Sequence, residues 1–155
     1  MKHIQEDKDE LFRLWTLMRN ASHIINRVRD QELRQHDITA RQTNVLGMIN
    51  RLGGEATNTE IARRMFRDPS TIFNIINVLH RKGYITKSRD AVNKHWVRLS
   101  LTDQGESVYR AALQREKVAG VMHSLSVEER EQFQKSLEIL RDKGMSELGI
   151  SPERR

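Results

Sequence analysis

The sequence predicts a mainly α-helical fold with one small β-hairpin near the middle of the chain. Apolar residues recur at steps of three and four along most of the 155 residues, which is the spacing of one helix face. The period changes to two between residues 84 and 101, where side chains alternate as they do in half-buried strands. Helix-capping residues stand before several of the periodic segments, so helix boundaries are also predicted.

The first two helices are expected before residue 55. One covers residues 9–34 with no proline to interrupt it, and the next begins at Thr39 and ends at Gly53 and Gly54. Their apolar faces contain Leu11, Leu14, Trp15, Met18, Ile24, Ile25 and Val28, then Val45, Leu46 and Ile49.

A pair of short helices follows, and each has its own start signal. Thr57 and Glu60 fit a capping box, in which the Thr57 hydroxyl accepts from the Glu60 amide and the Glu60 side chain reaches back. Asp68 can cap the next helix, and Pro69 suits its first turn because the missing N–H costs nothing there. Gly83 ends that helix. The inward positions are Ile61, Ala62 and Met65, then Ile72, Ile75, Ile76 and Leu79.

A charged hairpin comes directly after the helix pair. Residues 84–89 and 95–101 are the expected strands, joined by a polar turn, with Val97, Leu99 and Leu101 inward. Two short helices with a tight turn, followed by a basic hairpin, are typical of a winged helix-turn-helix. In that arrangement the second helix enters the major groove of B-DNA, and the hairpin reaches phosphates or the minor groove.

Long helices are expected again after the hairpin. Thr102 caps one over about residues 103–122, and a capping box of Ser126 and Glu129 opens the last. That helix has Phe133, Leu137 and Leu140 inward, and residues 149–155 are expected to fray. The long terminal helices carry apolar stripes that one small domain cannot fully cover. An intertwined homodimer would bury these stripes, and packing within one chain is the alternative.

Positive charge is concentrated in the middle of the chain. The net charge is +6, and residues 36–100 carry 11 basic and 5 acidic side chains, which accounts for the whole excess. Such a segment is the electrostatic signature of a polyanionic partner, although a solubilising surface has the same composition.

Several classes of function are excluded by what the sequence lacks. Without cysteine there is no disulfide scaffold, thiolate zinc site or iron–sulfur cluster. The six histidines lack metal-ligand spacing, and there is no phosphate loop, nucleophile elbow or paired-carboxylate signature. We therefore expect no enzyme activity, no cofactor and no metal. No apolar run is long enough to span a bilayer and the N-terminus is charged, so we expect a cytoplasmic protein that does not contact membranes.

The outward face of the fourth helix points to base reading. It is small, polar and free of acids, and asparagine can pair bidentately with adenine. An ordinary solvated face is the alternative, but such faces usually carry Glu and Lys, which form helices better. The residues of this face are Ser70, Thr71, Asn74, Asn77 and Arg81.

Basic side chains flank this face on both sides. Those of the hairpin can bind phosphates, although lysines at a hairpin edge also prevent aggregation. Those of the third helix can hold phosphates or be solvated. Phe73 either contacts a thymine methyl or packs at the core edge. The hairpin set is Lys87, Arg89, Lys94, His95 and Arg98, and the helix set is Arg63, Arg64 and Arg67.

A set of motifs in a fixed order resembles the MarR family of bacterial and archaeal transcriptional regulators, over about residues 9–148. The motifs are Thr57-x-x-Glu60-Ile61-Ala62, Asp68-Pro69-Ser70-Thr71-Ile72, Leu79-x-x-x-Gly83-Tyr84-Ile85, Val97-x-Leu99-x-Leu101-Thr102-x-x-Gly105 and Leu125-Ser126-x-x-Glu129. The resemblance implies a homodimer that places one recognition helix on each half of a palindromic operator. It further implies a ligand-responsive repressor, released from double-stranded DNA by a small anionic or aromatic effector.

The resemblance also implies how the chain is divided. Residues 36–101 would form the DNA-binding lobe, and residues 9–35 with 102–148 the dimerisation region. The family's hairpin typically reads Asp-x-Arg, where this chain has Asn93-Lys94-His95, so the guanidinium contact to the minor groove is absent. The effector site is unassigned, since His23 and Arg27 fit an anionic ligand or an inter-helix salt bridge equally. A winged module that binds protein instead of DNA is the alternative function.

Overall fold

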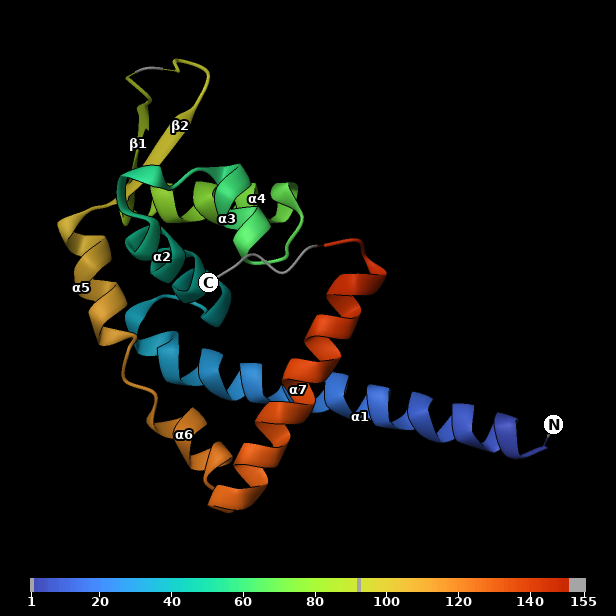
Figure 1. The fold of residues 1–155 in the computed structure, drawn as a ribbon. Coiled ribbons are helices and arrows are strands. Elements are labelled where there is room, and N and C mark those ends of the chain that lie inside the picture. Colours follow the sequence, from blue (N-terminus) through green and yellow to red (C-terminus); the bar gives the residue numbers. More distant parts are fainter. Residues whose placement is uncertain (1, 92, 151–155) are drawn as a thin grey trace. The chain divides into compact units, whose positions relative to one another are not determined.

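The computed structural model describes residues 2–91 and 93–150, with side chains from residue 7 onward, and it is mainly helical with one hairpin (Figure 1). The described residues fall into two compact units, one up to Lys117 and one from Val118 onward. The division into a 36–101 lobe and a dimerisation region stays a prediction. The elements are α1 (Lys2–Leu33), α2 (Ala40–Leu52), α3 (Asn58–Arg64), α4 (Pro69–Arg81), β1 (Ile85–Arg89), β2 (Val97–Leu101), α5 (Asp103–Ala111), α6 (Glu116–Met122) and α7 (Val127–Glu147).

The predicted capping signals are largely confirmed. Thr39 caps α2 in a capping box with Gln42, and the Asp68 carboxylate accepts from the Ser70 amide at 2.7 Å at the start of α4. Ser126 and Glu129 form the expected box at the start of α7. Since these bonds satisfy amides that have no partner inside the helix, they determine where each helix begins.

The capping box expected at α3 is only half formed. The Thr57 hydroxyl accepts from the Glu60 amide at 3.2 Å, as predicted. The Glu60 carboxylate does not complete the box but binds Arg63 and Arg64, which lie three and four residues along the same helix. These charge-assisted bonds replace the expected reach back to Thr57.

One apolar core joins α2, α3, α4 and the hairpin. The apolar faces predicted for these helices point into it, and α1 joins it only near its C-terminal end, at Leu33. Gly83, at a φ of +73°, ends α4, and the Tyr84 amide donates to the Leu79 carbonyl there. The largest fully buried side chains are Leu33, Val45, Leu46, Ile49, Ile61, Ile72, Leu79, Ile85 and Leu99.

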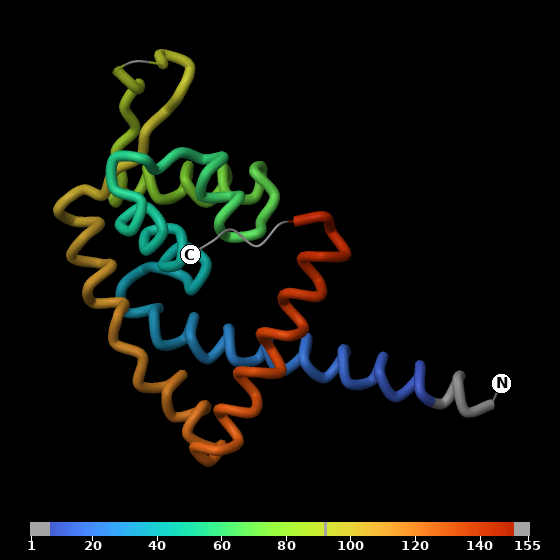
Figure 2. Tube along the Cα trace, in the orientation of Figure 1, coloured from blue at the N-terminus to red at the C-terminus, as the bar shows by residue number. Residues whose placement is uncertain are grey.

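The hairpin pairs antiparallel and projects from the helices of its own unit (Figure 2). Ile85 lies opposite Leu101, and the Leu99 amide donates to the Ala56 carbonyl just before α3. That hydrogen bond connects the second strand of the hairpin to the segment that leads into α3. The second strand begins at Val97 rather than at residue 95, and Val97 is exposed, so its predicted inward position is wrong. The alternation fails there because the strand has already left the core.

The helix expected over residues 103–122 is interrupted, so that prediction is wrong. α5 ends at Ala111 and α6 begins at Glu116. Arg29 of α1 donates to the carbonyl oxygens of Ala112 and Gln114, the latter at 2.8 Å. These carbonyl oxygens accept hydrogen bonds from the guanidinium rather than from backbone amides of a continuing helix, and the chain turns at this point.

The last helix exposes the apolar stripe that was expected to face inward. Phe133, Leu137 and Leu140 are 43%, 38% and 55% exposed, so the residues of their own unit do not bury them, and their inward position stays a prediction. The expectation of fraying over residues 149–155 falls mostly on 151–155, which lie outside the described residues. Among the described residues, no helix is both long and apolar enough to cross a membrane.

Candidate nucleic-acid interface

The outward face of α4 is exposed and carries no acid. Thr71, Asn74 and Arg81 are exposed, and Asn77 is half-buried. Ser70 is exposed too, but its hydroxyl donates to the Asp68 carboxylate at 2.6 Å and is part of the helix cap. The Ser70 hydroxyl and amide hold the pKa of the Asp68 carboxyl below its usual range. Four of the five predicted side chains therefore point outward without belonging to the cap.

Lys87 of β1 connects the hairpin to this face. Its Nζ donates to Oδ1 of Asn77 at 2.7 Å and lies 5.8 Å from the centroid of the Phe73 ring. Asn77 and Lys87 were predicted as separate contacts, and the structure brings them together. Phe73 is 52% exposed, so it does not pack inside the core.

Three contacts, two to the Asp90 carboxylate and one to the Asn93 side chain, hold the hairpin tip. Asp90 pairs with Arg98 across the strands at 2.6 Å, and the Asn93 amide donates to Asp90 at 2.7 Å. Oδ1 of Asn93 accepts from the His95 amide at 3.2 Å. Arg98 also lies 5.2 Å from the ring centroid of Trp96. Arg98 is thus partly buried in a brace, whereas Arg89, Lys94 and His95 are exposed.

The arginines of the first short helix are partly engaged. Arg63 and Arg64 both bind Glu60, and these hydrogen bonds lower the pKa of Glu60 to about 2. Arg67 is exposed in the turn before α4. The pairing leaves the two guanidinium groups at the surface, 45% exposed each, with part of their charge neutralised.

A groove of about 600 Å³ lies between the hairpin, α4 and the start of α3. Phe73, Trp96 and Val97 line it with exposed apolar surface, and Ile76 and Leu99 lie deeper. Lys87 also lines it. Sequence reasoning missed the groove and the brace, although Trp96 on an outward position and opposite charges at Asp90 and Arg98 were signals for both.

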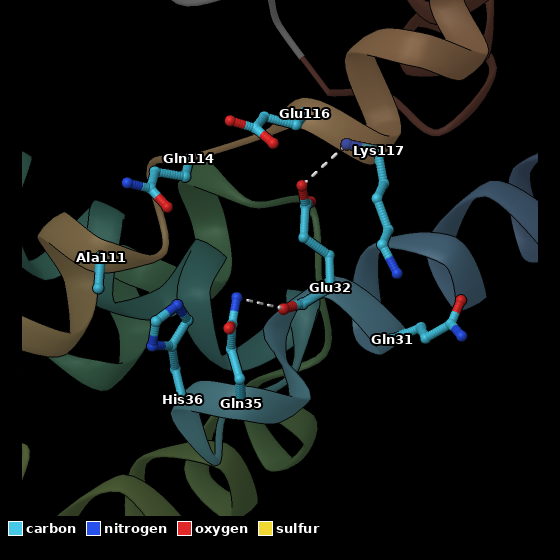
Figure 3. Close-up of a pocket in the computed structure, with 8 residues that line it drawn as sticks. All are labelled: Gln31, Glu32, Gln35, His36, Ala111, Gln114, Glu116 and Lys117. Carbon is cyan, nitrogen blue, oxygen red and sulfur yellow. Dashed lines mark hydrogen bonds between the residues drawn. The ribbon is translucent and has the colours of Figure 1, made fainter.

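A smaller hollow of about 280 Å³ lies between the end of α1 and the segment joining α5 to α6 (Figure 3). Glu32 accepts from the Lys117 amide at 2.9 Å, and Gln35 donates to the Glu32 carbonyl at 3.3 Å. Burial raises the pKa of Glu32, but the Lys117 amide and Arg29 outweigh it and lower the pKa overall. These polar groups are already used to hold the chain, and neither His23 nor Arg27 lines the hollow.

Comparison with known proteins gives a consistent set of relatives. The sequence profile of the MarR family matches residues 36–94. The chain is similar to the HTH-type transcriptional regulator TtmR of Methylorubrum extorquens (strain PA1), at 26% identity over 122 residues. That match covers 79% of this chain and 62% of TtmR, so the chain spans about three fifths of that relative's length.

Solved structures agree with the sequence matches. The organohalide-sensing regulator RdhR with 2,4-dichlorophenol bound is similar at a TM-score of 0.79 and 29% identity, covering 84% of this chain and 78% of RdhR. The S. aureus MepR–DNA complex is similar at a TM-score of 0.75 and 29% identity, covering 83% of this chain and 96% of MepR. The likeness covers more than four fifths of this chain, while the roles of the individual residues above stay predictions.

Proposed function

Since this chain belongs to the MarR family of winged helix-turn-helix transcriptional regulators, we propose that it regulates transcription by binding specific sites on double-stranded DNA. Its family and relatives are transcriptional regulators and not enzymes. The observation that carries the proposal is the exposed, acid-free polar face of α4 beside a basic hairpin. A face of that composition suits the donor and acceptor pattern of the major groove.

In this proposal α4 is the recognition helix. Asn74 is exposed at its middle and can pair bidentately with adenine, and Arg81 lies on the same face. Lys94 and His95, exposed at the hairpin tip, meet phosphates of the adjacent backbone. Such phosphate contacts position the protein, while the base contacts of α4 supply the sequence preference.

A homodimer on a palindromic operator is the second part of the proposal. α1 exposes a row of large apolar side chains, and exposed apolar patches of this kind mark interaction sites. α7 exposes another stripe, and a second copy of the chain would cover both. Half-sites would then lie about one helical turn of DNA apart, roughly 34 Å. The exposed side chains are Leu11, Phe12, Leu14, Trp15, Leu17 and Ile24 of α1, and Phe133, Ile139 and Leu140 of α7.

Repression relieved by a small aromatic or anionic effector is the third part. The support is a relative: RdhR, at 29% identity, has a solved form with 2,4-dichlorophenol bound. A compound that binds the DNA-free conformation more tightly than the DNA-bound conformation would weaken operator binding, and the ratio of its two affinities sets the size of the effect.

The deciding experiment is selection of bound sequences from a random duplex pool at about 0.15 M salt, which is near physiological ionic strength. We expect an inverted repeat, and a dimer by light scattering. Recovery of no sequence over background would contradict specific DNA binding and favour a winged module that contacts protein.

Two variants separate base reading from phosphate binding on the selected operator. Asn74→Ala should relax the base preference at one position per half-site, at a cost of about 1–3 kcal/mol on the preferred base. Lys94→Ala should weaken all sequences alike and reduce the salt slope by about one. The matched controls are Asn44→Ala on α2 and Lys135→Ala on α7, both exposed and outside these surfaces. Equal weakening of every sequence by Asn74→Ala would refute its role in base reading.

A further inference from the structure

We propose that Arg29, Asp30 and Glu32 at the end of α1 clamp the DNA-binding lobe in place and thereby set the spacing of half-sites that the dimer accepts. The lobe is the part of the chain built on the shared core of α2, α3, α4 and the hairpin. This inference rests on the proposed function, because it concerns a dimer on a palindromic operator. The three side chains are positioning residues, which act on DNA binding only through the lobe.

The clamp consists of side chains that bind backbone groups of segments distant in the sequence. Oδ1 of Asp30 accepts from the Ala40 amide at 2.7 Å, at the start of α2. Arg29 donates to two carbonyl oxygens just after α5, and Glu32 accepts from the Lys117 amide at 2.9 Å. The end of α1 is thus bonded both to the segment that leads into the lobe and to the segment that follows α5.

α5 belongs to the same body as the lobe because it packs closely on it. The Thr102 amide before α5 donates to the Tyr84 carbonyl at 3.1 Å, and a Cβ at Gly105 would lie 1.9 Å from that carbonyl oxygen. Ala112, directly after α5, is fully buried in the shared core. The contacts that α1 makes at α2 and after α5 therefore hold one body at two places.

The joint between α1 and the lobe depends on these polar contacts. Among the described residues of α1, the buried core includes only Leu33, and a single apolar anchor leaves the lobe free to rotate about it. A hollow of about 280 Å³ beside the anchor is lined mainly by polar side chains and adds little apolar packing (Figure 3). Arg29 and Glu32 are only 12% and 10% exposed, whereas the pair of Arg110 and Glu106 on α5 is 73% and 49% exposed. Shielding from water makes the clamp the stronger of the two pairs.

α1 connects the clamp to the surface proposed for dimerisation. It is one helix over Lys2–Leu33, and its exposed apolar side chains include Leu14, Trp15 and Leu17. Trp15 lies roughly 20 Å from Asp30 along the helix axis. A helix without a break transmits the orientation of the dimer contact to the clamp, so the clamp determines where each α4 lies relative to its copy.

DNA geometry makes half-site spacing a measure of how freely the lobes move. One base pair inserted between the half-sites moves them apart by about 3.4 Å and turns one against the other by about 34°. A clamped lobe cannot follow, so the insertion should weaken wild-type binding at least about thirtyfold. A released lobe can follow, so Asp30→Ala should reduce this spacing penalty to about fivefold or less. Anisotropy titrations on operators with one or two base pairs inserted or deleted measure both penalties.

Conservative and neighbouring variants separate positioning from folding. Asp30→Asn keeps an oxygen acceptor for the Ala40 amide and should keep the wild-type spacing penalty. Glu32→Ala releases the Lys117 amide and should reduce the penalty as Asp30→Ala does. Gln31→Ala, exposed between these two acids, is the control. Circular dichroism confirms that each variant is folded at the assay temperature.

A second measurement follows the lobes without DNA. The chain has no cysteine, so Ser88→Cys on the exposed face of the hairpin provides one spin-label site per protomer. Double electron–electron resonance then gives the distribution of distances between the two labels of a dimer. Asp30→Ala should make that distribution about twice as wide as in wild type, and Asp30→Asn should leave it unchanged.

Each possible outcome bears on one of the two proposals. If Asp30→Ala weakens every spacing by the same factor, or if Asp30→Asn behaves like Asp30→Ala, the inference is overturned. An unchanged distance distribution, or a wild type that selects an inverted repeat but binds all spacings alike, would overturn it too. A monomeric wild type, or one that selects no inverted repeat, would instead contradict the proposed function.

Discussion

Arg29 and Glu32, one turn apart on α1, form a nearly buried ion pair at 2.5 Å that closes the break between α5 and α6. The Arg29 guanidinium donates hydrogen bonds to the carbonyl oxygens of Ala112 and Gln114, just after the end of α5. The Glu32 carboxylate accepts a hydrogen bond from the Lys117 amide at the start of α6. One ion pair thus satisfies backbone donors and acceptors on both sides of an irregular segment, which otherwise lack helical partners.

Removing Arg29 should therefore be costly. Arg29→Met leaves two carbonyls and the Glu32 carboxylate without their shared donor, and the free energy of unfolding should fall by about 2–3 kcal/mol. Urea denaturation at fixed protein concentration measures this, since dimerisation would otherwise shift the midpoint. Arg13→Met, an exposed arginine on the same helix, is the control. A loss as small as that of the control would show that the pair does not hold the break.

Two glycines in helices should respond oppositely to the same substitution. A Cβ at Gly105 would lie 1.9 Å from the Tyr84 carbonyl oxygen, which belongs to backbone and cannot simply rotate away. Gly105→Ala should cost about 3 kcal/mol. At Gly144 an added Cβ meets no described atom within 4 Å, so Gly144→Ala should raise stability by about 0.5–1 kcal/mol through helix propensity. Similar effects at both sites would contradict the close packing of α5 on Tyr84.

The Glu60 ion pairs predict a specific acid response. Arg63 and Arg64 lower the pKa of Glu60 from 4.5 to about 2, so the unfolded chain binds this proton at higher pH than the folded chain does. The resulting stability is fully present above pH 4.5 and is lost as the pH falls toward 2. Because the pair is partly exposed, the effect should stay within about 1 kcal/mol.

Glu60→Gln should therefore flatten stability against pH in that interval relative to wild type. Unfolding by urea over the interval measures the difference, and Glu131→Gln, exposed on α7, is the control. A variant that loses stability with acid as steeply as wild type would contradict the pairing.

The brace between Asp90 and Arg98 predicts coupled effects on DNA binding. If Arg98 acts by holding the hairpin, Asp90→Asn and Arg98→Met should each weaken binding by a similar factor of about five, and the double variant should be no worse. If Arg98 instead contacts phosphate directly, Asp90→Asn would strengthen binding by freeing the guanidinium. Anisotropy titrations of the single and double variants distinguish these outcomes.

Local chemistry made most of the fold predictable. Thr39, Asp68 and Ser126 were identified as helix caps because such caps act on amides only two or three residues away. The helical spacing of the apolar residues was enough to predict the outward face of α4. A helix that buries Ile72 and Ile76 must turn Asn74 outward.

What could not be predicted depends on residues far apart in the sequence. The break after Ala111 contains neither glycine nor proline, and its partner Arg29 lies 85 residues from Gln114. The contact of Lys87 with Asn77 required the hairpin to be placed against α4. What covers the apolar stripe of α7 could not be predicted, because such a stripe shows that something covers it without showing whether the cover belongs to the same chain.

The hydrogen bond from Lys87 determines how Asn77 can be read by a partner. With Oδ1 turned toward the hairpin ammonium, the side-chain amide presents its NH₂ group outward. If α4 enters the major groove as proposed, Asn77 would act there as a donor, suited to purine N7, guanine O6 or thymine O4. The two-point pairing with adenine needs an acceptor as well, and that geometry is left to Asn74. Under the proposed function, two asparagines spaced three residues apart on one helix would therefore form different hydrogen bonds with the base pairs.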